Sequence, residues 1–215
     1  MKAYKFRSST QADFIFDILM NKRLYCSDWK NLNDPMEGIF AYSHNYESFV
    51  EQKIKEIGDS KRQYKICSLS RTFDNHLLWA HYANGFDGVA IEIELPEDNH
   101  NIKELDYDRG VFANVNITPH SDAEKIAKDI LFSKYNVWRY EEEIRILHDQ
   151  SFYQNIEVTK VICGHRMNQA LHDVLNLVCN QLNIEFTKVG IGDEGLDADS
   201  VEPLNLENFK YKVVP

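Results

Sequence analysis

The segment 88–95, GVAIEIEL, constrains the fold most, because its apolar and acidic residues alternate strictly. Successive side chains of a strand point to opposite faces of a sheet, so Val89, Ile91 and Ile93 share one face and the glutamates share the other. This alternation is typical of a strand with one buried face. The chain must therefore build a sheet that other elements cover.

Further strands are expected from short runs of β-branched and aromatic residues, and helices from apolar residues spaced three and four apart. The expected strands cover residues 2–6, 23–27, 64–70, 102–108, 140–147, 156–164, 184–192 and 209–215. One expected helix contains Phe14, Ile15, Ile18 and Leu19, and the others cover 45–60, 74–85, 121–135 and 167–182. Strands and helices mix without a strict βαβ rhythm, and no linker divides the chain. This predicts a single α+β domain over residues 1–215, with a mixed, largely antiparallel sheet flanked by helices.

Charge and composition favour a cytoplasmic protein. The formal net charge of −10 disfavours a broad nucleic-acid surface, which needs a basic face. No apolar run approaches the roughly 20 residues of a membrane span, and the N-terminus lacks the apolar stretch of a signal peptide. Cys26, Cys67, Cys163 and Cys179 form no CxxC pair, so we expect reduced thiols in the cytoplasm and no membrane partner.

The stretch NVWRYEEEIRIL, residues 136–147, carries the strongest candidate site. If it is a strand throughout, Glu141, Glu143 and Arg145 share one face at steps of about 7 Å. Two carboxylates and a guanidinium on one surface form either an ion-pair ladder or a binding site. Both interpretations are open on the residues alone.

Three segments resemble the bacterial family of unknown function DUF2971: LYCSDWKNLNDPMEG (24–38), CSLSRTFDNHLLWAHYANGFDGVAIEIEL (67–95) and WRYEEEIRIL (138–147). The family pattern has an early lNDPfE, an SlS strand, a WahYa…GvciEf segment and a W-x-Y-E-x-E-x-R strand. All four occur in order over about residues 3–190. The resemblance implies a bacterial protein whose genes accompany toxin and phage-defence genes.

The chain is also similar, more distantly, to ADP-ribosyltransferases of the Arg–Ser–Glu type. Their basic residue on the first strand would be Arg7, their strand serine Ser68 or Ser70, and their E-x-E pair Glu141 and Glu143. This chain has SLS where the transferases have STS, and a longer separation between the two strands. The resemblance implies NAD as substrate, a transferase-like split sheet and an unknown acceptor, either protein or nucleic acid.

Each candidate residue has a chemical role and a structural alternative. In ADP-ribosyl transfer, Glu143 would stabilise the developing ribosyl cation and Glu141 would orient or deprotonate the acceptor. Arg7 could clamp a pyrophosphate. Ser68 and Ser70 could hydrogen-bond a ribose or an amide, and Tyr82 could stack on nicotinamide or adenine. The alternatives are an ion-pair ladder, a surface arginine, ordinary strand serines and core packing.

Three functions remain open. The first is NAD-dependent ADP-ribosyl transfer. The second is a hydrolase or nuclease in which Glu141, Glu143 and Asp34 hold a divalent metal, although the histidines and cysteines lack ligand spacing and no metal is expected. The third is a binding module in which the charged ladder is structural.

Overall fold

The computed structural model describes residues 1–43, 49–149 and 151–205, and their contacts group into two compact units. The first unit contains Met1–Arg23, Ser70–Pro96 and the described residues from Asn155 on. The second contains Leu24–Leu69 and Glu97–Gln154. The expectation of one domain over residues 1–215 stays a prediction.

The sheet of the first unit is mixed. Its strand order is β12-β11-β10-β5-β1. The strands are β1 (Lys2–Ser8), β5 (Gly88–Glu94), β10 (Glu157–Cys163), β11 (Glu185–Ile191) and β12 (Leu196–Ser200). β5 is antiparallel to both β1 and β10, and β11 is antiparallel to β12. β10 and β11 are parallel, which requires a crossover connection, and helix α5 (Gln169–Gln181) supplies it.

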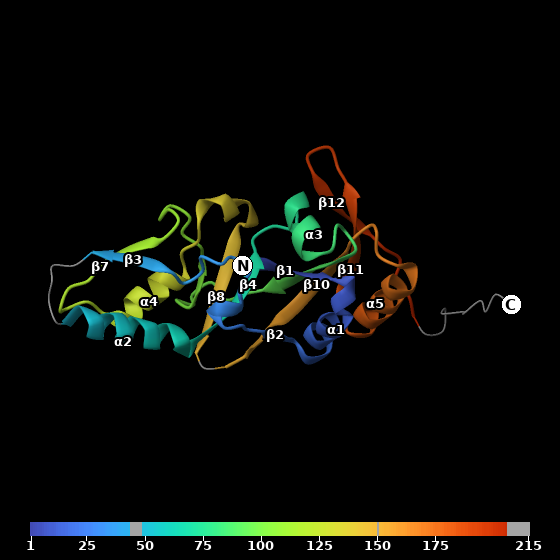
Figure 1. Cartoon of the computed structure of the whole chain (residues 1–215). Coiled ribbons are helices and arrows are strands. Elements are labelled where there is room, and N and C mark those ends of the chain that lie inside the picture. Colours follow the sequence, from blue (N-terminus) through green and yellow to red (C-terminus); the bar gives the residue numbers. More distant parts are fainter. Residues whose placement is uncertain (44–48, 150, 206–215) are drawn as a thin grey trace. The chain divides into compact units, whose positions relative to one another are not determined.

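Helices cover both faces of this sheet. Helix α3 (His76–Tyr82) lies on one face, and α1 (Ala12–Asn21) and α5 lie on the other (Figure 1). Trp79 of α3 is fully buried, with its ring 5.3 Å from those of Phe6 and Phe86. Its Nε1 donates a hydrogen bond to the Phe73 carbonyl at 2.8 Å, which satisfies its polar atom. Trp79 is thus a core residue.

Side-chain caps explain where three of the helices begin. Asn75 accepts a hydrogen bond from the Leu77 amide at 2.9 Å and starts α3. Asp122 accepts from the second and third amides of α4 (Ala123–Leu131), and Asn168 caps α5 in the same way. Each cap satisfies amides that have no partner within the helix.

The loop after α3 is fixed by close backbone contacts. Asn84, Gly85 and Phe86 have positive φ angles of 49°, 64° and 71°. A Cβ on the neighbouring Gly88 would lie 2.3 Å from the Arg7 carbonyl oxygen, so only glycine fits there. Phe86 keeps its unfavourable conformation because its ring stacks on Trp79 and its carbonyl accepts from the Arg166 amide at 3.0 Å.

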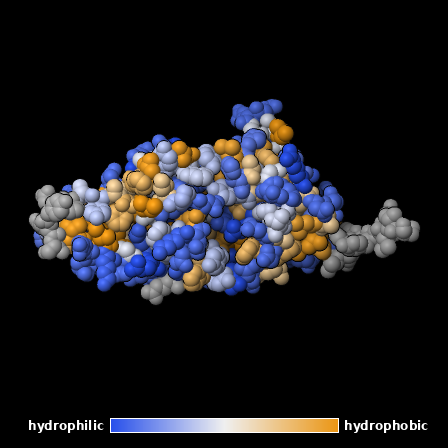
Figure 2. Space-filling model, viewed as in Figure 1, coloured by the Kyte–Doolittle hydropathy of each residue, from blue (hydrophilic) through white to orange (hydrophobic). Residues whose placement is uncertain are grey.

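The second unit combines strands with two packed helices. Strands β4 (Tyr64–Ser70), β8 (Glu143–Asp149) and β6 (Ile102–Glu104) are neighbours in that order. Two short pairs are β2 (Arg23–Tyr25) with β9 (Tyr153–Asn155), and β3 (Phe40–Ser43) with β7 (Ala113–Asn116). Helices α2 (Phe49–Gln63) and α4 pack through Ile57, Ala127 and Ile130, and the outward side of α2 is hydrophilic (Figure 2). Three 3₁₀ turns, η1 (Ser9–Gln11), η2 (Trp29–Asn31) and η3 (Asn136–Glu141), complete the elements described.

The prediction of a mixed α/β fold with a mixed sheet and several helices is confirmed. The strand expected over 102–108 ends at Glu104, and β3, β7, β9 and β12 were not expected. The strand expected over 209–215 and the first residues of the helix expected over 45–60 lie outside the described residues. Within the described ranges, no helix combines the length and the apolar composition needed to cross a bilayer.

Candidate functional site

The E-x-E segment is a junction between a 3₁₀ turn and a strand. Residues Asn136–Glu141 form η3, Glu142 adopts a left-handed conformation with φ 41°, and β8 begins at Glu143. The strand predicted over 140–147 is therefore wrong for its first three residues. The alternation rule assumes extended backbone throughout, and Glu142 breaks that condition. Even so, Glu141 and Glu143 contact the same ammonium group.

Five charged side chains of the second unit form a buried charge cluster: Glu37, Lys134, Glu141, Glu143 and Arg145. Arg145 is 0% exposed and Glu143 is 3% exposed. Three carboxylates against two cations give the cluster a formal charge of −1. The surface ladder considered from the sequence is thus a buried network, in which pairing matters far more than at a surface.

Arg145 is the centre of the buried charge cluster. Its Nη1 and Nη2 donate to the two carboxylate oxygens of Glu37 at 3.0 and 2.8 Å. Its Nε donates to Oε1 of Glu143 at 2.9 Å, and Nη1 also donates to the Leu131 carbonyl. These contacts engage all three guanidinium nitrogens, and the paired contact with Glu37 is the fork geometry that arginine favours with carboxylates.

Lys134 holds the remaining carboxylates. Its Nζ lies 2.7 Å from Oε2 of Glu143 and also donates to Oε2 of Glu141. The same Nζ lies 5.2 Å from the centre of the Trp138 ring, which covers it with an aromatic face. Both oxygens of Glu143 are therefore in ion pairs, one with Arg145 and one with Lys134.

Ser68 and Tyr107 complete the surroundings of Glu143. Ser68 of β4 hydrogen-bonds the Glu143 carboxylate, and β4 is the neighbour of β8. The Glu143 amide donates to the Tyr107 hydroxyl at 2.9 Å. The structure thus brings together Ser68, Glu141 and Glu143, three of the residues expected at a site.

Neighbouring charges keep Glu143, Arg145 and Lys134 ionised in spite of their burial. Burial raises the pKa of Glu143, but Arg145 and Lys134, with the hydrogen bonds from Lys134 and Ser68, lower it to about 2 overall. Burial lowers the pKa of Arg145, but Glu143 and Glu37 raise it above its ordinary value. Burial likewise lowers the pKa of Lys134, and Glu143 and Glu141 outweigh this and raise it. The charged forms of these three residues are therefore stabilised by their neighbours rather than by water.

We expect the low pKa of Glu143 to make the free energy of unfolding decrease as the pH falls. The pKa of Glu143 is depressed from 4.5 to about 2, so its stabilising contribution is present above pH 4.5 and is lost as the pH falls toward 2. Glu143→Gln should remove up to about 1.4 kcal/mol per pH unit from the slope of unfolding free energy over this window. Glu142→Gln, at the exposed neighbouring position, is the matched control and should keep the slope. Urea denaturation between pH 2 and 5 measures this, and equal slopes for both variants would refute it.

The NDPMEG turn positions Glu37 for Arg145. Oδ1 of Asp34 accepts from the Met36 amide at 2.9 Å, and the Asp34 carbonyl accepts from the Glu37 amide at 3.1 Å. A cavity of about 10 Å³ beside this turn is lined by residues that include Asp34, Glu37 and Lys134. That volume holds about one water molecule, so it is too small for a ribose.

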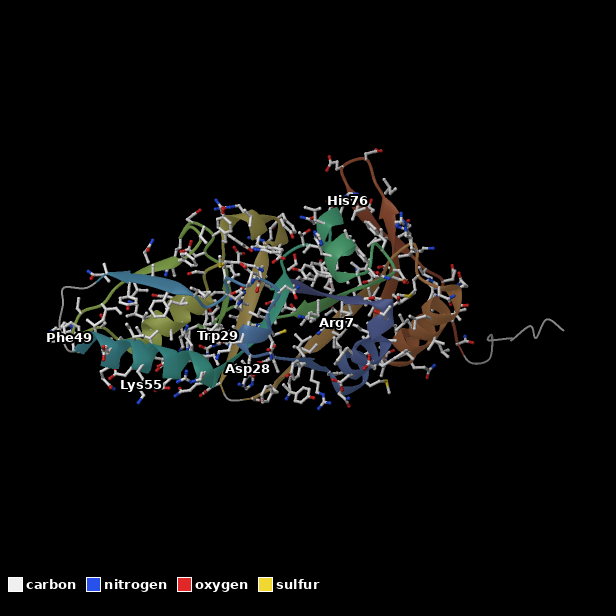
Figure 3. The ribbon with its side chains drawn as sticks, viewed as in Figure 1. Arg7, Asp28, Trp29, Phe49, Lys55 and His76 are labelled. Carbon is white, nitrogen blue, oxygen red and sulfur yellow. The ribbon has the colours of Figure 1, made fainter. Side chains whose placement is uncertain are left out.

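The other candidate residues belong to the first unit. Arg7 lies on β1 (Figure 3). Its guanidinium carbon is 5.7 Å from the centre of the Phe14 ring. Ser70 is buried, and its Oγ accepts from the Thr72 amide at 3.2 Å. Tyr82, the last residue of α3, packs against the apolar cluster around Trp79. That at least three of Arg7, Ser68, Tyr82 and Glu143 line one concave pocket stays a prediction.

A metal role for the carboxylates lacks a donor set. Among the residues that the structure describes, no group of three His, Cys, Asp or Glu side chains is arranged to hold a metal ion. Glu141 and Glu143 instead contact the Lys134 ammonium, which occupies the position a cation would take between them.

Two members of the buried charge cluster, Glu37 and Lys134, were not predicted from the sequence. Glu37 had a signal, because it is the glutamate of the lNDPfE pattern. Lys134 had no such signal, since a single lysine near the end of a predicted helix is usually solvated.

No family model, no curated protein and no solved structure matches this chain.

Proposed function

We propose that this protein is a binding module in which the E-x-E-x-R segment has a structural role. The observation that carries the proposal is the pairing of Glu143, whose two oxygens face Arg145 and Lys134 in a site only 3% exposed. A carboxylate that binds a ribose hydroxyl needs an oxygen that the ligand reaches. Here both oxygens serve the protein itself.

The buried charge cluster joins segments that are distant along the chain. Arg145 of β8 connects the turn at Glu37 with the Leu131 carbonyl at the end of α4. Moving such charges out of water costs several kcal/mol each, so they persist only where the contacts are complete. A pairing this specific favours one arrangement of these segments. We therefore assign the buried charge cluster a structural role in the second unit.

ADP-ribosyl transfer is the second candidate, and one observation favours it. The hydrogen bond between Ser68 and Glu143 unites the serine strand and the E-x-E pair, as the resemblance to Arg–Ser–Glu transferases implies. In this function Lys134 would release one oxygen of Glu143 to the ribose of NAD, with Glu141 directing the acceptor. The same resemblance, with that to DUF2971, implies a toxin or phage-defence setting for such an enzyme.

Incubation with labelled NAD and bacterial lysate separates the two candidates. We expect no transfer of label to protein or nucleic acid above that of Glu143→Gln, because the Glu143 carboxylate has no oxygen to offer. Transfer by the wild-type protein that is lost in Glu143→Gln and kept in the exposed control Glu142→Gln would establish the transferase instead. Circular dichroism of each variant confirms that the lost transfer is not lost folding.

We also propose a cytoplasmic location. Cys26, Cys67, Cys163 and Cys179 are all buried, and none is in a disulfide. Buried reduced thiols suit a reducing compartment. Labelling of the unfolded, unreduced protein with a thiol reagent should modify all four cysteines, and fewer would argue for an oxidising compartment.

A further inference from the structure

In the first unit, residues 201–205, VEPLN, follow β12 and belong to no helix or strand, and two asparagines of α5 hold their backbone. Nδ2 of Asn176 donates to the Glu202 carbonyl at 2.8 Å, and its Oδ1 accepts from the Leu204 amide at 3.1 Å. Nδ2 of Asn180 donates to the Leu204 carbonyl at 2.9 Å. None of these residues belongs to the buried charge cluster.

The three backbone groups in these bonds are a set that one edge of an extended chain presents. In an extended chain, the amide and the carbonyl of every second residue point to the same side, as in a β-strand. Glu202 and Leu204 are such alternate residues, and Pro203 between them has no amide hydrogen. The side-chain amides of Asn176 and Asn180 therefore take the place of a neighbouring strand.

The segment explains why an asparagine is buried in α5. Asn176 is 2% exposed, a position in a helix that an apolar residue usually fills, and asparagine has a low helix propensity. Its side chain offers both a donor and an acceptor, and the backbone of the segment satisfies both. Asn176 is therefore suited to recognise a main chain rather than a particular side chain.

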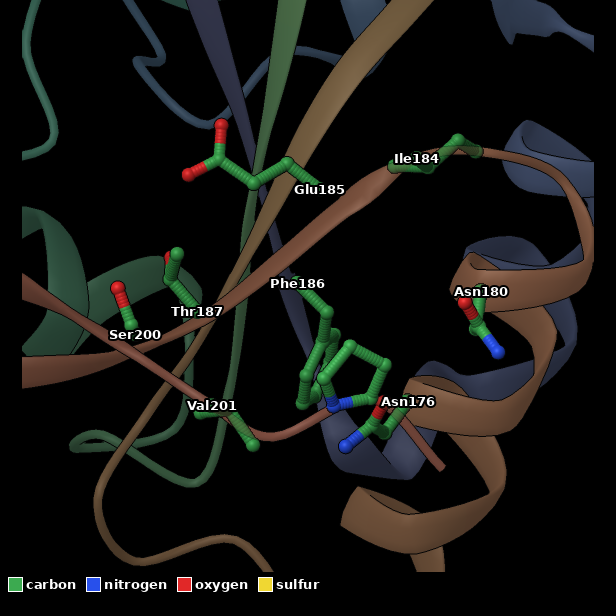
Figure 4. A pocket seen from close by; sticks show the side chains of 9 residues that line it. Asn176, Asn180, Ile184, Glu185, Phe186, Thr187, Ser200 and Val201 are labelled. Carbon is green, nitrogen blue, oxygen red and sulfur yellow. The ribbon is translucent and has the colours of Figure 1, made fainter. Parts of the chain in front are cut away.

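Apolar contacts determine which extended chain fits best. Val201 and Pro203, alternate residues that share one side of an extended chain, line a pocket together with Ile184 and Phe186 (Figure 4). The pocket has a volume of about 190 Å³, so it has room for a larger side chain at the position of Val201. In strand-like peptide recognition, main-chain hydrogen bonds give affinity and pockets for alternate side chains give specificity.

We propose that Asn176, Asn180, Ile184 and Phe186 form a peptide site that binds an extended segment of a partner protein, and that residues 201–205 occupy this site within the chain itself. The inference rests on the proposed function as a binding module and names its partner class. The partner segment carries an apolar side chain larger than valine at the first apolar position and competes with residues 201–205.

The same contacts argue against a second copy of this chain as the occupant. The 201–205 segment of another copy has the same side chains, so it gains no contact over the segment already bound. The attached segment also has the advantage of a high effective concentration. A partner with a larger apolar side chain has the additional contact that a second copy lacks.

The probe is a fluorescently labelled peptide, SLEPLN, which copies residues 200–205 with the change Val201→Leu. Fluorescence anisotropy with the full chain should show that it binds. Methylation of the backbone nitrogen at the second leucine removes the donor to Asn176 and should weaken binding at least about tenfold. This comparison uses the wild-type protein, so it stays decisive if a variant does not fold.

Two variants of the full chain should change peptide binding in opposite directions. Pro203→Gly keeps every hydrogen bond of the segment but favours its release, so the peptide should bind about two- to fivefold more tightly. Asn176→Ala removes two hydrogen bonds to the peptide and should weaken binding at least about tenfold. Glu202→Gln is the control on the segment, because this side chain is exposed, and it should leave the affinity unchanged.

Each other outcome contradicts a stated part of the proposal. Absence of peptide binding to both the wild type and Pro203→Gly at millimolar concentration would make residues 201–205 a fixed part of the fold. That result would overturn the peptide site and leave the binding function in place. A dimer in sedimentation velocity that the peptide dissociates would assign the site to a second copy instead, whereas label transfer from NAD would overturn the binding function itself.

Discussion

Arg145→Met should lower the unfolding free energy by about 3–5 kcal/mol, the usual cost of removing one partner from a buried ion pair. The variant leaves Glu37 and Glu143 buried without the guanidinium that contacts both. Only Lys134 would remain, against three carboxylates. Urea denaturation followed by tryptophan fluorescence measures the loss.

A compensated variant keeps this prediction testable if Arg145→Met does not fold. Replacing Glu37, Glu143 and Arg145 together by methionine, leucine and methionine removes the charges and keeps apolar volume. Such replacements are often neutral or stabilising, so the triple variant should recover most of the lost stability. Arg139→Met, at an arginine paired with the exposed Asp108, is the control and should cost no more than about 1 kcal/mol. A small loss for Arg145→Met would show that the cluster contributes little to the second unit.

Trp79→Ala should cost the first unit about 3–5 kcal/mol of unfolding free energy, as expected for a large aromatic side chain removed from a core. Trp79 is fully buried between Phe6 and Phe86, and it also satisfies the Phe73 carbonyl. The loss should include the stacking that keeps Phe86 in its left-handed conformation. Urea denaturation followed by circular dichroism is the measurement.

Leu77→Ala is the matched control for Trp79, because Leu77 lies on the same helix and is 47% exposed. We expect it to cost less than about 1 kcal/mol. Comparable losses for the two variants would mean that α3 is stabilised by its own helical structure rather than by the tryptophan.

Residue patterns predicted the strands and helices whose apolar residues recur with a clear period. β5 lies within the strand expected over 88–95, β4 matches its predicted residues 64–70, and α5 lies within the helix expected over 167–182. The single buried face expected for β5 is wrong, because Glu92 is only 3% exposed; it pairs with Lys2 at 3.0 Å and accepts a hydrogen bond from the Tyr4 hydroxyl at 3.0 Å. Strands such as β3 and β7 were missed because four residues are too short to establish a period. β12 was missed because LDADS is polar at alternating positions and has low strand propensity.

At the candidate site, too, local patterns predicted some residues, and only tertiary contacts revealed the others. Glu141, Glu143 and Arg145 were identified from their spacing, and the serine strand from its resemblance. Their charge partners were not predicted, because spacing within residues 141–145 carries no information on Glu37 and Lys134, which reach the cluster from a turn and from beyond the end of α4.

By itself, the sequence determined the fold class, most of the helices and strands, and the presence of a charged segment at residues 141–145. Those properties follow from local periodicity and propensity, which neighbouring residues carry. Only the tertiary structure decided that the charged segment is buried and paired, and that a pocket lies between α5, β11 and the chain after β12 (Figure 4). Burial and pairing depend on side chains far apart along the chain. Local spacing cannot encode their contacts, because each unit is assembled from separate segments.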